Sequence, residues 1–370
     1  MRKGHASIAA ALTGILLAVP LCACSSGVLE LNDVDGFVNI HTDEQAWYLN
    51  SSDYDGITAD GSVENSRPRP LRLSWSYDDC KDYTVELSLD EGFDNSLAYH
   101  TSKTYIDVYN LYLDTAYYWR VTAKSNGGAT VVSEPSIFLT TGDAPRNIYV
   151  DGVTNVRDLG GWAVENSEAR VKQGMIYRCG RLNKSRQSDV EIEITERGIE
   201  TMHDELGIKA EIDLRRPDAL NDETGGLTFS PIGSDVQYYN VPMNMDVANT
   251  NKLEGNAESI KAFFALLGDK DNYPMIFHCD IGTDRTGMCA FLINGLLGVS
   301  EEDLYRDYLF SNFGKIGGKR TLTNITDAYV KTLKAYRGGT FAEKIRNYLV
   351  DEIGVAASDI DTLSEMMHGE

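Results

Sequence analysis

The most informative stretch of the chain places a cysteine and an arginine six positions apart, at Cys279 and Arg285. The apolar run at 273–278 before the cysteine predicts a buried strand, and the run at 286–297 after the arginine predicts a buried helix. A loop between a strand and a helix can curl so that consecutive backbone N–H groups face one oxyanion. A thiol, a curled loop and a guanidinium together suit thiol-based transfer of a phosphoryl group.

Each part of this loop has a chemical task. Gly282 permits the backbone angles of the curl, and the following helix adds the positive end of its dipole. With the charge of Arg285, these effects are expected to lower the pKa of the Cys279 thiol and so favour the nucleophilic thiolate. The planar fork of Arg285 can hold two phosphate oxygens. The Thr286 hydroxyl can donate to the sulfur, and His278 can orient the loop.

We therefore expect Cys279 and Arg285 to be catalytic. The phosphate of the substrate is expected to lie against the rest of the loop, that is Asp280, Ile281, Gly282, Thr283 and Thr286. From about residue 148 onward, predicted strands alternate with predicted helices, as at 209–214, 235–241 and the helix that starts after Ser300. This alternation is typical of an α/β domain with a mostly parallel sheet flanked by helices.

Further stretches follow the motif order of a known family. They are Asn155-Val-Arg-Asp-Leu-Gly-Gly161, Tyr177-Arg-Cys-Gly-Arg-Leu182, Ile212-Asp-Leu-Arg-Arg-Pro-Asp218, Gly298-Val-Ser-Glu-Glu-Asp-Leu304 and Asp307-Tyr308-Leu309. With His278-Cys-Asp-Ile-Gly-Thr-Asp-Arg-Thr-Gly287, they make residues 148–365 resemble the bacterial tyrosine/serine protein phosphatases, a branch of the cysteine-dependent tyrosine phosphatases. The resemblance implies a two-step reaction through a phosphocysteine, with no metal and no other cofactor. It implies a phosphotyrosine substrate, with phosphoserine or phosphoinositide as further candidates.

Two positions depart from the family pattern. Family members usually carry Lys where this chain has Thr283, and Ser where it has Cys179. A lysine in the loop favours multiply phosphorylated inositol headgroups. Thr283 together with the acidic Asp280 therefore argues against a phosphoinositide substrate.

The reaction also needs a general acid that protonates the leaving oxygen and then activates water. The resemblance favours Asp284, because the family carries Asp at the matching loop position. Asp218, after the Asp-Leu-Arg-Arg stretch, and Asp246, on a loop after a predicted strand, are the alternatives. Asp284 could instead brace Arg285 or the loop.

Other residues of these motifs are expected to have supporting roles. Asn155, Arg157 and Asp158, with the glycines that follow, are expected to build a strand and turn beside the site. Arg181 and Arg215 either extend phosphate recognition or form surface ion pairs. Cys289 is interpreted as a small buried hydrophobic residue, with a disulfide to oxidised Cys279 as the alternative.

An all-β region precedes the α/β region. Residues 71–75, 83–89, 117–123 and 136–140 alternate apolar and polar side chains, which predicts short strands of a β-sandwich. Residues 67–142 resemble a fibronectin type III domain, whose core positions here hold Trp75, Leu111, Tyr117 and Trp119. The resemblance implies a spacer or binding module without chemistry. Residues 24–66 are rich in Ser, Asp, Asn and Gly and are interpreted as a tether, with short strands at residues 37–40 and 46–49 as the alternative.

The first 23 residues read as a processing signal rather than as part of the fold. Arg2 and Lys3 give a positive start, and the apolar run that follows is too short for a comfortable membrane span. It ends in Leu21-Cys22-Ala23-Cys24, which resembles a bacterial lipobox. The resemblance implies acylation of Cys24, so lipid would hold the exported protein on the extracytoplasmic face of the bacterial cell envelope, at the outer or plasma membrane. A plain secretory signal is the alternative.

The amino-acid composition of the chain limits which classes of binding partner are expected. The chain has 370 residues, which favours two domains, and 56 acidic against 34 basic residues, for a net charge of -22. Such a surface repels nucleic acid, so we expect no nucleic-acid partner. We expect a phosphatase domain at 148–368 that hydrolyses phosphate monoesters, foremost protein phosphotyrosine with dual specificity in addition. The alternatives are an inositol phosphate or phosphoinositide phosphatase and a non-enzymatic surface binding protein.

Overall fold

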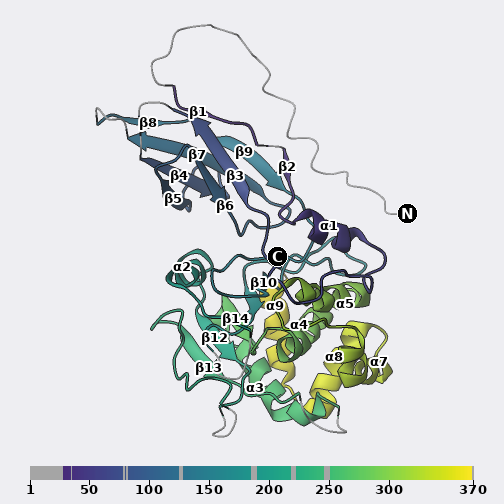
Figure 1. The fold of residues 1–370 in the computed structure, drawn as a ribbon. Helices are drawn as coiled ribbons and strands as arrows, with labels where there is room; N and C mark the ends of the chain where they lie inside the picture. Colours follow the sequence, from purple (N-terminus) through teal and green to yellow (C-terminus); the bar gives the residue numbers. More distant parts are fainter. Residues whose placement is uncertain are drawn as a thin grey trace.

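The computed structural model describes residues 28–34, 36–77, 80, 82–124, 128–184, 190–217, 222–245 and 251–368. The predicted signal peptide, the acylation site Cys24 and the acid candidates Asp218 and Asp246 lie outside these ranges. A β-rich region and an α/β region adjoin one another (Figure 1).

The β-rich region contains two sheets. One has the strand order β1-β3-β6, and the other has the order β2-β9-β7-β4-β5 with β8 beside β7. The strands are β1 Glu30–Leu31, β2 Phe37–Val38, β3 Leu71–Ser76, β4 Tyr83–Ser88, β5 Leu97–Thr101, β6 Tyr105–Val108, β7 Ala116–Lys124, β8 Thr130–Val132 and β9 Ser136–Thr140. All pairs are antiparallel except β2 with β9. The four residues predicted for its core, Trp75, Leu111, Tyr117 and Trp119, are buried, and the likeness to fibronectin type III stays a prediction.

The segment predicted as a tether is built into the fold from residue 28 onward. Its strand β1 pairs with β3 and its strand β2 with β9. The helix α1 Asp43–Asn50 begins with a capping box at Thr42. Tyr48 of this helix is 1% exposed, and its hydroxyl donates to the Arg306 carbonyl 3.2 Å away. Figure 1 shows α1 beside α5 Glu301–Phe310. Scattered apolar residues thus anchor a segment whose polar composition suggested a tether.

The α/β region is organised around a five-stranded sheet of order β10-β11-β14-β12-β13. Its strands are β10 Arg157–Asp158, β11 Ile176–Cys179, β12 Ala210–Asp213, β13 Gln237–Asn240 and β14 Met275–His278. Only β10 runs antiparallel to its neighbour. The parallel strands therefore end together at one edge, where the chain enters the Cys279 loop.

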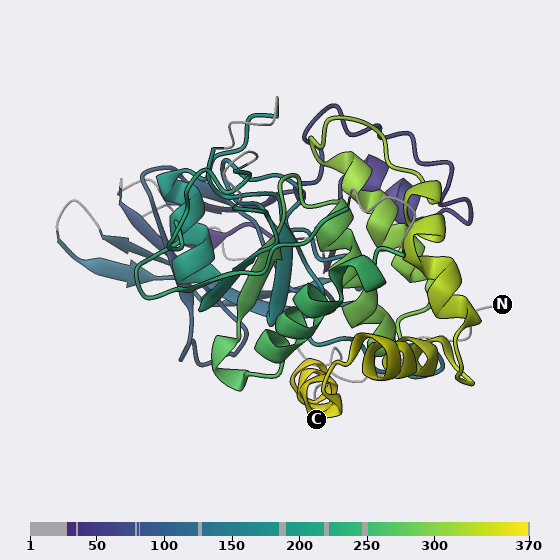
Figure 2. The same cartoon turned by 90° about the horizontal axis from the view of Figure 1, so that it is seen from below.

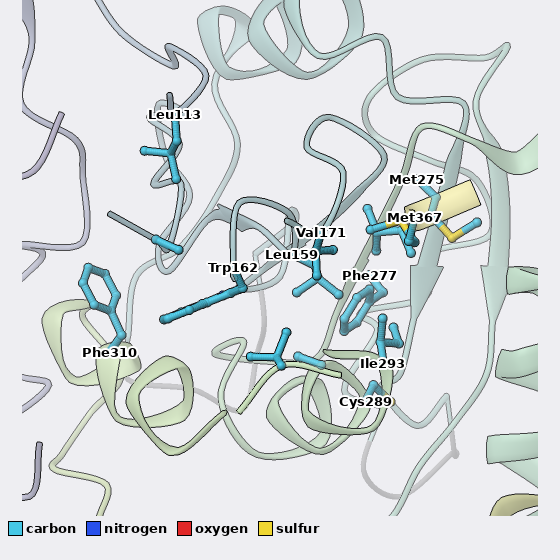
Figure 3. Close-up of a cluster of buried hydrophobic side chains, with 14 of the residues drawn as sticks. Leu113, Leu159, Trp162, Val171, Met275, Phe277, Cys289, Ile293, Phe310 and Met367 are labelled. Atoms are coloured by element: carbon cyan, nitrogen blue, oxygen red, sulfur yellow. The ribbon is translucent and has the colours of Figure 1, made fainter. Parts of the chain in front are cut away.

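Both faces of this sheet are buried. Because side chains alternate along a strand, Met275 and Phe277 point to one face and Ile276 to the other. Met275 and Phe277 belong to the main apolar core, and Ile276 packs in a second cluster with Met202. Figure 3 shows Phe277 near Ile293 of the helix that follows the loop, and Met275 near Met367.

Helices of the C-terminal third cover the first face, and in Figure 2 they lie together on one side of the strands. The helices from residue 196 onward are α2 Glu196–Glu200, η1 Thr201–Glu205, η2 Glu254–Asn256, α3 Ala257–Leu267, η3 Lys270–Asn272, α4 Asp284–Leu296, α5 Glu301–Phe310, η4 Ser311–Phe313, α6 Thr323–Ile325, η5 Thr326–Val330, α7 Lys331–Ala335, α8 Phe341–Tyr348, η6 Leu349–Ile353 and α9 Ala357–Met367. The predicted start of α5 is confirmed, since the Ser300 hydroxyl accepts from the Asp303 N–H. Across the described ranges, every helix is too short or too polar to cross a bilayer.

The two regions share one apolar core. Leu113 of the β-rich region lies in the same cluster as Leu159 and Trp162 of the α/β region (Figure 3). The backbone N–H and carbonyl of Leu113 also bond the Gln173 side chain, at 2.8 and 3.0 Å. The Arg146 guanidinium, at the junction, donates to the Leu111 carbonyl. The boundary near residue 145 is therefore a packed interface.

Candidate active site

The predicted loop surrounds a cavity at the end of the parallel strands. Cys279 follows β14 directly and is 2% exposed. The cavity has a volume of about 230 Å³ and is lined by Arg216, Glu223, Met243, Asn244, Met245, Cys279, Asp280, Ile281, Asp284 and Arg285. The structure thus brings the predicted nucleophile and arginine together with two of the predicted loop residues, Asp280 and Ile281, and with the acid candidate Asp284. Gly282, Thr283 and Thr286 do not line this cavity.

Buried side chains pull the carbonyl groups of the loop outward. The Asn155 amide donates to the Gly282 and Ile281 carbonyls, at 2.9 and 3.4 Å. Arg178 donates to the Gly282 carbonyl at 2.8 Å, and the Arg181 N–H donates to the Asp280 carbonyl at 3.0 Å. Three consecutive carbonyls are therefore fixed from outside the loop.

This arrangement orients the amides. In a trans peptide unit the C=O and N–H point in opposite directions. Fixing the carbonyls of residues 280, 281 and 282 outward therefore turns the N–H groups of residues 281, 282 and 283 to the other side, as an anion-binding nest requires. Gly282 has φ of +70°, and a Cβ there would lie 2.4 Å from the Cys179 carbonyl oxygen. Only glycine fits that position.

The surroundings of Cys279 favour its thiolate. Burial alone would raise the pKa of the thiol, but the charge of Arg285 and hydrogen bonds from the Thr286 side chain and backbone outweigh burial and lower that pKa. The Thr286 hydroxyl is fully buried and makes no hydrogen bond of ordinary geometry within the described ranges, so it remains available to the Cys279 sulfur, whose pKa it lowers. The negative charge of Asp284 acts in the opposite direction.

Arg285 is held by one of its nitrogen atoms. Its Nη1 donates to Glu223 Oε2 at 2.5 Å and to the carbonyls of Leu214 and Met243 at 3.3 and 3.5 Å. Among the described residues, Nε and Nη2 bond to no protein acceptor. This free edge has the geometry that binds two oxygens of one phosphate.

Sequence reasoning missed Glu223. Its carboxylate bridges Arg285 and the Nη2 of Arg216, which lies 3.1 Å from Oε1. Burial opposes ionisation of Glu223, yet the charge of Arg285 and the hydrogen bonds from both arginines bring its pKa below the usual range. It lies outside the motifs that carry the resemblance, and no local pattern marks it.

Asp284, the favoured general acid, faces the cavity but is already paired. Arg320 donates to both of its carboxylate oxygens at 3.1 Å, and the Tyr308 hydroxyl lies 3.4 Å from Oδ1. Asp284 must leave Arg320 before it can donate a proton. The rivals Asp218 and Asp246 fall outside the described residues, so the structure does not compare the three.

The residues of the Asn155 motif belong to a buried network of ion pairs and hydrogen bonds beside the loop. Arg157 pairs with Asp307 at 2.8 Å, and Arg178 reaches the same carboxylate at 2.8 Å. Burial and the nearby charge of Arg157 lower the pKa of Arg178 to about 10. Asp158 pairs with Arg146 at 3.0 Å, although burial raises its pKa. None of Asn155, Arg157 and Asp158 lines the cavity. Asn155 bonds the loop directly and Arg157 bonds the Asn155 side chain, whereas Asp158 bonds Arg146 and the N–H groups of Gly160 and Gly174.

His278 sits behind the loop among buried carboxylates. Its Nε2 lies 2.9 Å from Glu211 Oε1, and its Nδ1 lies 3.0 Å from the Cys279 carbonyl oxygen. Burial works against the imidazolium, but Asp213 and Glu211 more than compensate and raise the pKa of His278. A protonated ring can donate at both nitrogens, so His278 ties the start of the loop to β12.

The remaining candidates are paired inside the protein. Arg181 bonds Asp280 Oδ1 at 2.9 Å and Arg215 bonds Asp213 at 2.6 Å; both arginines are buried, so the surface ion pairs proposed for them are wrong. Cys289 lies among apolar side chains (Figure 3), 3.7 Å from the Met243 sulfur. Burial raises its thiol pKa, as expected of a small hydrophobic residue. Within the described ranges, no three His, Cys, Asp or Glu side chains gather as metal ligands.

Comparison with known proteins places this site in context. The profile of the family described as "Tyrosine phosphatase family" matches residues 148–369. A protein of Cupriavidus necator, provisionally named a tyrosine-protein phosphatase, is 29% identical over 185 residues; the match covers 45% of this chain and 63% of that relative. The chain thus spans less than two thirds of that relative.

Solved structures also align with about half of this chain. The core catalytic domain of the PP-IP phosphatase Siw14 from S. cerevisiae, in complex with citrate, is 18% identical with a TM-score of 0.31, covering 52% of this chain and 93% of that one. A second structure of the Siw14 catalytic core is 16% identical with the same TM-score, covering 54% and 98%.

Proposed function

The chain belongs to the tyrosine phosphatase family, and we propose that it hydrolyses phosphate monoesters through a phosphocysteine on Cys279. The observation that carries this proposal is a buried thiol of lowered pKa beside the free edge of Arg285. In the first step the thiolate forms an S–P bond while the ester O–P bond breaks, and the leaving oxygen takes a proton from an aspartic acid. In the second step water attacks phosphorus, the S–P bond breaks, and inorganic phosphate and the thiolate are released.

Asp284 is our proposed proton donor and, in the second step, the base that activates water. Its support is its place in the cavity lining and its position at the start of α4. Its pairing with Arg320 suggests a cycle in which substrate binding draws the carboxyl group away from that arginine. The loop amides and the Nε and Nη2 of Arg285 bind the equatorial oxygens in both steps.

We propose phosphotyrosine in proteins as the main substrate, with phosphoserine as a second. Met243, Met245 and Ile281 give the cavity apolar surface against which an aromatic ring can pack. Each described carboxylate of the lining already pairs with an arginine. Because these pairs neutralise the arginines, few cationic groups remain to bind further phosphates. This favours a singly phosphorylated substrate over inositol polyphosphates.

The place of the protein in the cell is a separate proposal. We propose that the chain is exported and acylated at Cys24, and that the β-rich region acts as a fibronectin type III-like spacer. The support is the order of residues at 21–24 and the alternating strands of residues 67–142. Metabolic labelling with a fatty acid that is lost in Cys24→Ala would support the anchor, and equal labelling in both would refute it.

Phosphate release tests the enzymatic proposal. Phosphotyrosine peptide, phosphoserine peptide and inositol phosphates are supplied in the presence of EDTA, beside Cys279→Ser. We expect turnover that EDTA leaves intact and Cys279→Ser abolishes, highest with phosphotyrosine. Turnover that survives the substitution would refute the thiol mechanism. Preference for inositol phosphates would overturn the substrate class, and no turnover at all would favour a binding protein.

A further inference from the structure

Residues 57–66, between helix α1 and strand β3, run along the loop that follows α5. The N–H of Gly61 donates to the Asn312 carbonyl at 2.9 Å, and the N–H of Asn65 donates to the Phe313 carbonyl at 2.6 Å. The Gly61 carbonyl accepts in turn from Ile316 at 2.9 Å. Gly61 has φ of +77°, and a Cβ there would lie 2.6 Å from the Ile316 side chain. The contact is therefore close and specific.

One residue of this segment reaches the phosphate-binding loop through a single intermediate. The Ser66 hydroxyl accepts from the backbone N–H of Asn155 at 3.2 Å, and the Asn155 side chain in turn holds the Gly282 carbonyl. Ser66 is 4% exposed and Asn155 is fully buried. Asn155 also has φ of +58°, an uncommon conformation for a residue with a side chain. Such a conformation needs external bonds to persist.

Glu64 holds Ser66 in place. Its Oε1 accepts from the Ser66 N–H at 3.0 Å and from the Ser66 hydroxyl at 2.5 Å. Its Oε2 accepts from the Thr154 hydroxyl and from the Lys315 N–H, the latter at 3.2 Å. One carboxylate thus joins residues 64–66, the Asn155 turn and the loop after α5. Charge-assisted bonds of this kind are stronger than bonds between neutral groups.

The same segment reaches the other end of the phosphate-binding loop. Asn312, whose carbonyl accepts from Gly61, bonds Arg320 through its side chain, at 2.9 Å to the carbonyl and 2.6 Å to the N–H. Arg320 is the residue that pairs with Asp284. Residues 57–66 are therefore connected to Gly282 on one side of the loop and to Asp284 on the other.

We infer that Ser66 and Glu64 are positioning residues for the phosphate-binding loop, and that the backbone bonds of Gly61 and Asn65 hold these two residues in place. They touch neither the cavity nor the thiol. They fix Asn155, which fixes the carbonyls of residues 281 and 282 and so aims the amides at the phosphate. The inference deepens the proposed function and rests on it for its effect on turnover, but its effect on Cys279 does not depend on any substrate.

The test uses the full chain with Ser66→Ala and Glu64→Gln. Ser62→Ala is the matched control, because Ser62 is exposed in the same segment and its hydroxyl bonds Asp60 alone among the described residues. The first readout is the pH dependence of alkylation of Cys279 by iodoacetate, followed by mass spectrometry, which reports the thiol pKa. The second readout is kcat and KM for phosphate release. Thermal unfolding shows that each variant is folded.

Misaligned amides stabilise the thiolate and the transition state less well. We expect both substitutions to raise the thiol pKa relative to Ser62→Ala. We also expect kcat/KM to fall by about fivefold, mostly in kcat, which corresponds to about 1 kcal/mol for one lost hydrogen bond. Should Ser66→Ala fail to fold, Glu64→Gln keeps the shape of the side chain and one acceptor oxygen.

Two outcomes separate this inference from the proposed function. Variants that lower the melting temperature but keep the alkylation profile and kcat/KM of Ser62→Ala would show a purely structural role and overturn the inference. The second outcome is that the wild type turns over no phosphate ester while both variants still show a raised thiol pKa. That result would refute the proposed function and leave the positioning role standing.

Discussion

Glu223 Oε2 lies 2.5 Å from Nη1 of Arg285, on the side of the guanidinium that also faces the Leu214 and Met243 carbonyls. The carboxylate therefore fixes the plane of the guanidinium before any substrate arrives. Preorganisation of this kind lowers the cost of binding a phosphate and of reaching the transition state. It also leaves Nε and Nη2 of Arg285 for the phosphate of the proposed substrate, which gives the first prediction.

Arg285→Lys should lower kcat/KM by about 10²-fold or more, because an ammonium group cannot donate two parallel bonds to phosphate and meet Glu223 as well. The measurement is steady-state phosphate release from phosphotyrosine peptide. Arg72→Lys is the control, since Arg72 pairs with Asp107 on the exposed surface of the β-rich region. Equal activity of Arg285→Lys and the control would mean that the fork takes no part in catalysis.

Thr286→Val should raise the thiol pKa of Cys279. The Thr286 side chain lowers the pKa of the Cys279 thiol and so favours its charged form, and its removal should therefore favour the neutral thiol. At pH values below the thiol pKa, alkylation by iodoacetate should be slower than in the wild type, and the acidic limb of kcat/KM should move to higher pH. Thr130→Val, on the exposed strand β8, provides the comparison. A limb that stays in place, or moves toward acid, would contradict this account.

Asp284→Asn should lower kcat by about 10²-fold for phosphotyrosine and much less for p-nitrophenyl phosphate, whose leaving group needs little protonation. A second effect follows from charge. The Asp284 carboxylate raises the thiol pKa of Cys279, so its removal should shift the acidic limb to lower pH. Equal losses on both substrates would exclude Asp284 as the acid and direct attention to Asp218 and Asp246.

Asp307→Asn should destabilise the fold by about 3 kcal/mol at neutral pH, because it leaves Arg157 and Arg178 buried without a carboxylate. Asp327→Asn, which breaks an exposed pair with Lys331, should cost less than about 1 kcal/mol. Chemical denaturation of the two variants and the wild type measures both. Similar losses in the two variants would mean that the buried network adds little.

The same carboxylate gives a pH dependence with a definite sign. Burial works against its ionisation, but Arg157 and Arg178 bring the pKa of Asp307 below the value in the unfolded chain. Its contribution is therefore fully present above the unfolded pKa, about 3.9, and is lost as the pH falls through the folded pKa. The stability gap between wild type and Asp307→Asn should narrow on acidification. A gap that widens would contradict the sign.

The sequence was sufficient for the strand, loop and helix around Cys279, because local pattern fixes all three. Consecutive residues carry each signal: the apolar run before the loop, Gly282 inside the loop, and the apolar helix after the loop. The burial of Trp75 and Trp119 was expected from the resemblance to fibronectin type III domains, whose core positions they occupy, and both side chains are buried. Local structure that depends on residues close in sequence can be predicted from a single sequence.

The rest depends on contacts distant in sequence. Glu223 meets Arg285 across 62 positions, and Arg320 meets Asp284 across 36. No periodicity in either stretch announces the partner. The tether predicted for residues 28–66 was wrong for the same reason: Tyr48 gains its partner, the Arg306 carbonyl, 258 positions away. The alternative strand at residues 37–40 is present as β2, whereas residues 46–49 belong to helix α1. The composition of a polar segment does not show that a few of its apolar side chains pack against residues distant in sequence.

The bonds from Ser66 and Glu64 to the Asn155 turn also bear on how this architecture can be inherited. Recombination that joined a new partner at residue 148 would copy every catalytic residue and still leave Asn155 and Thr154 without their acceptors. The junction that composition marks as a domain boundary is therefore a poor crossover point. Descent should preserve residues 57–66 and the α/β region as one unit, whatever becomes of the strands encoded between them.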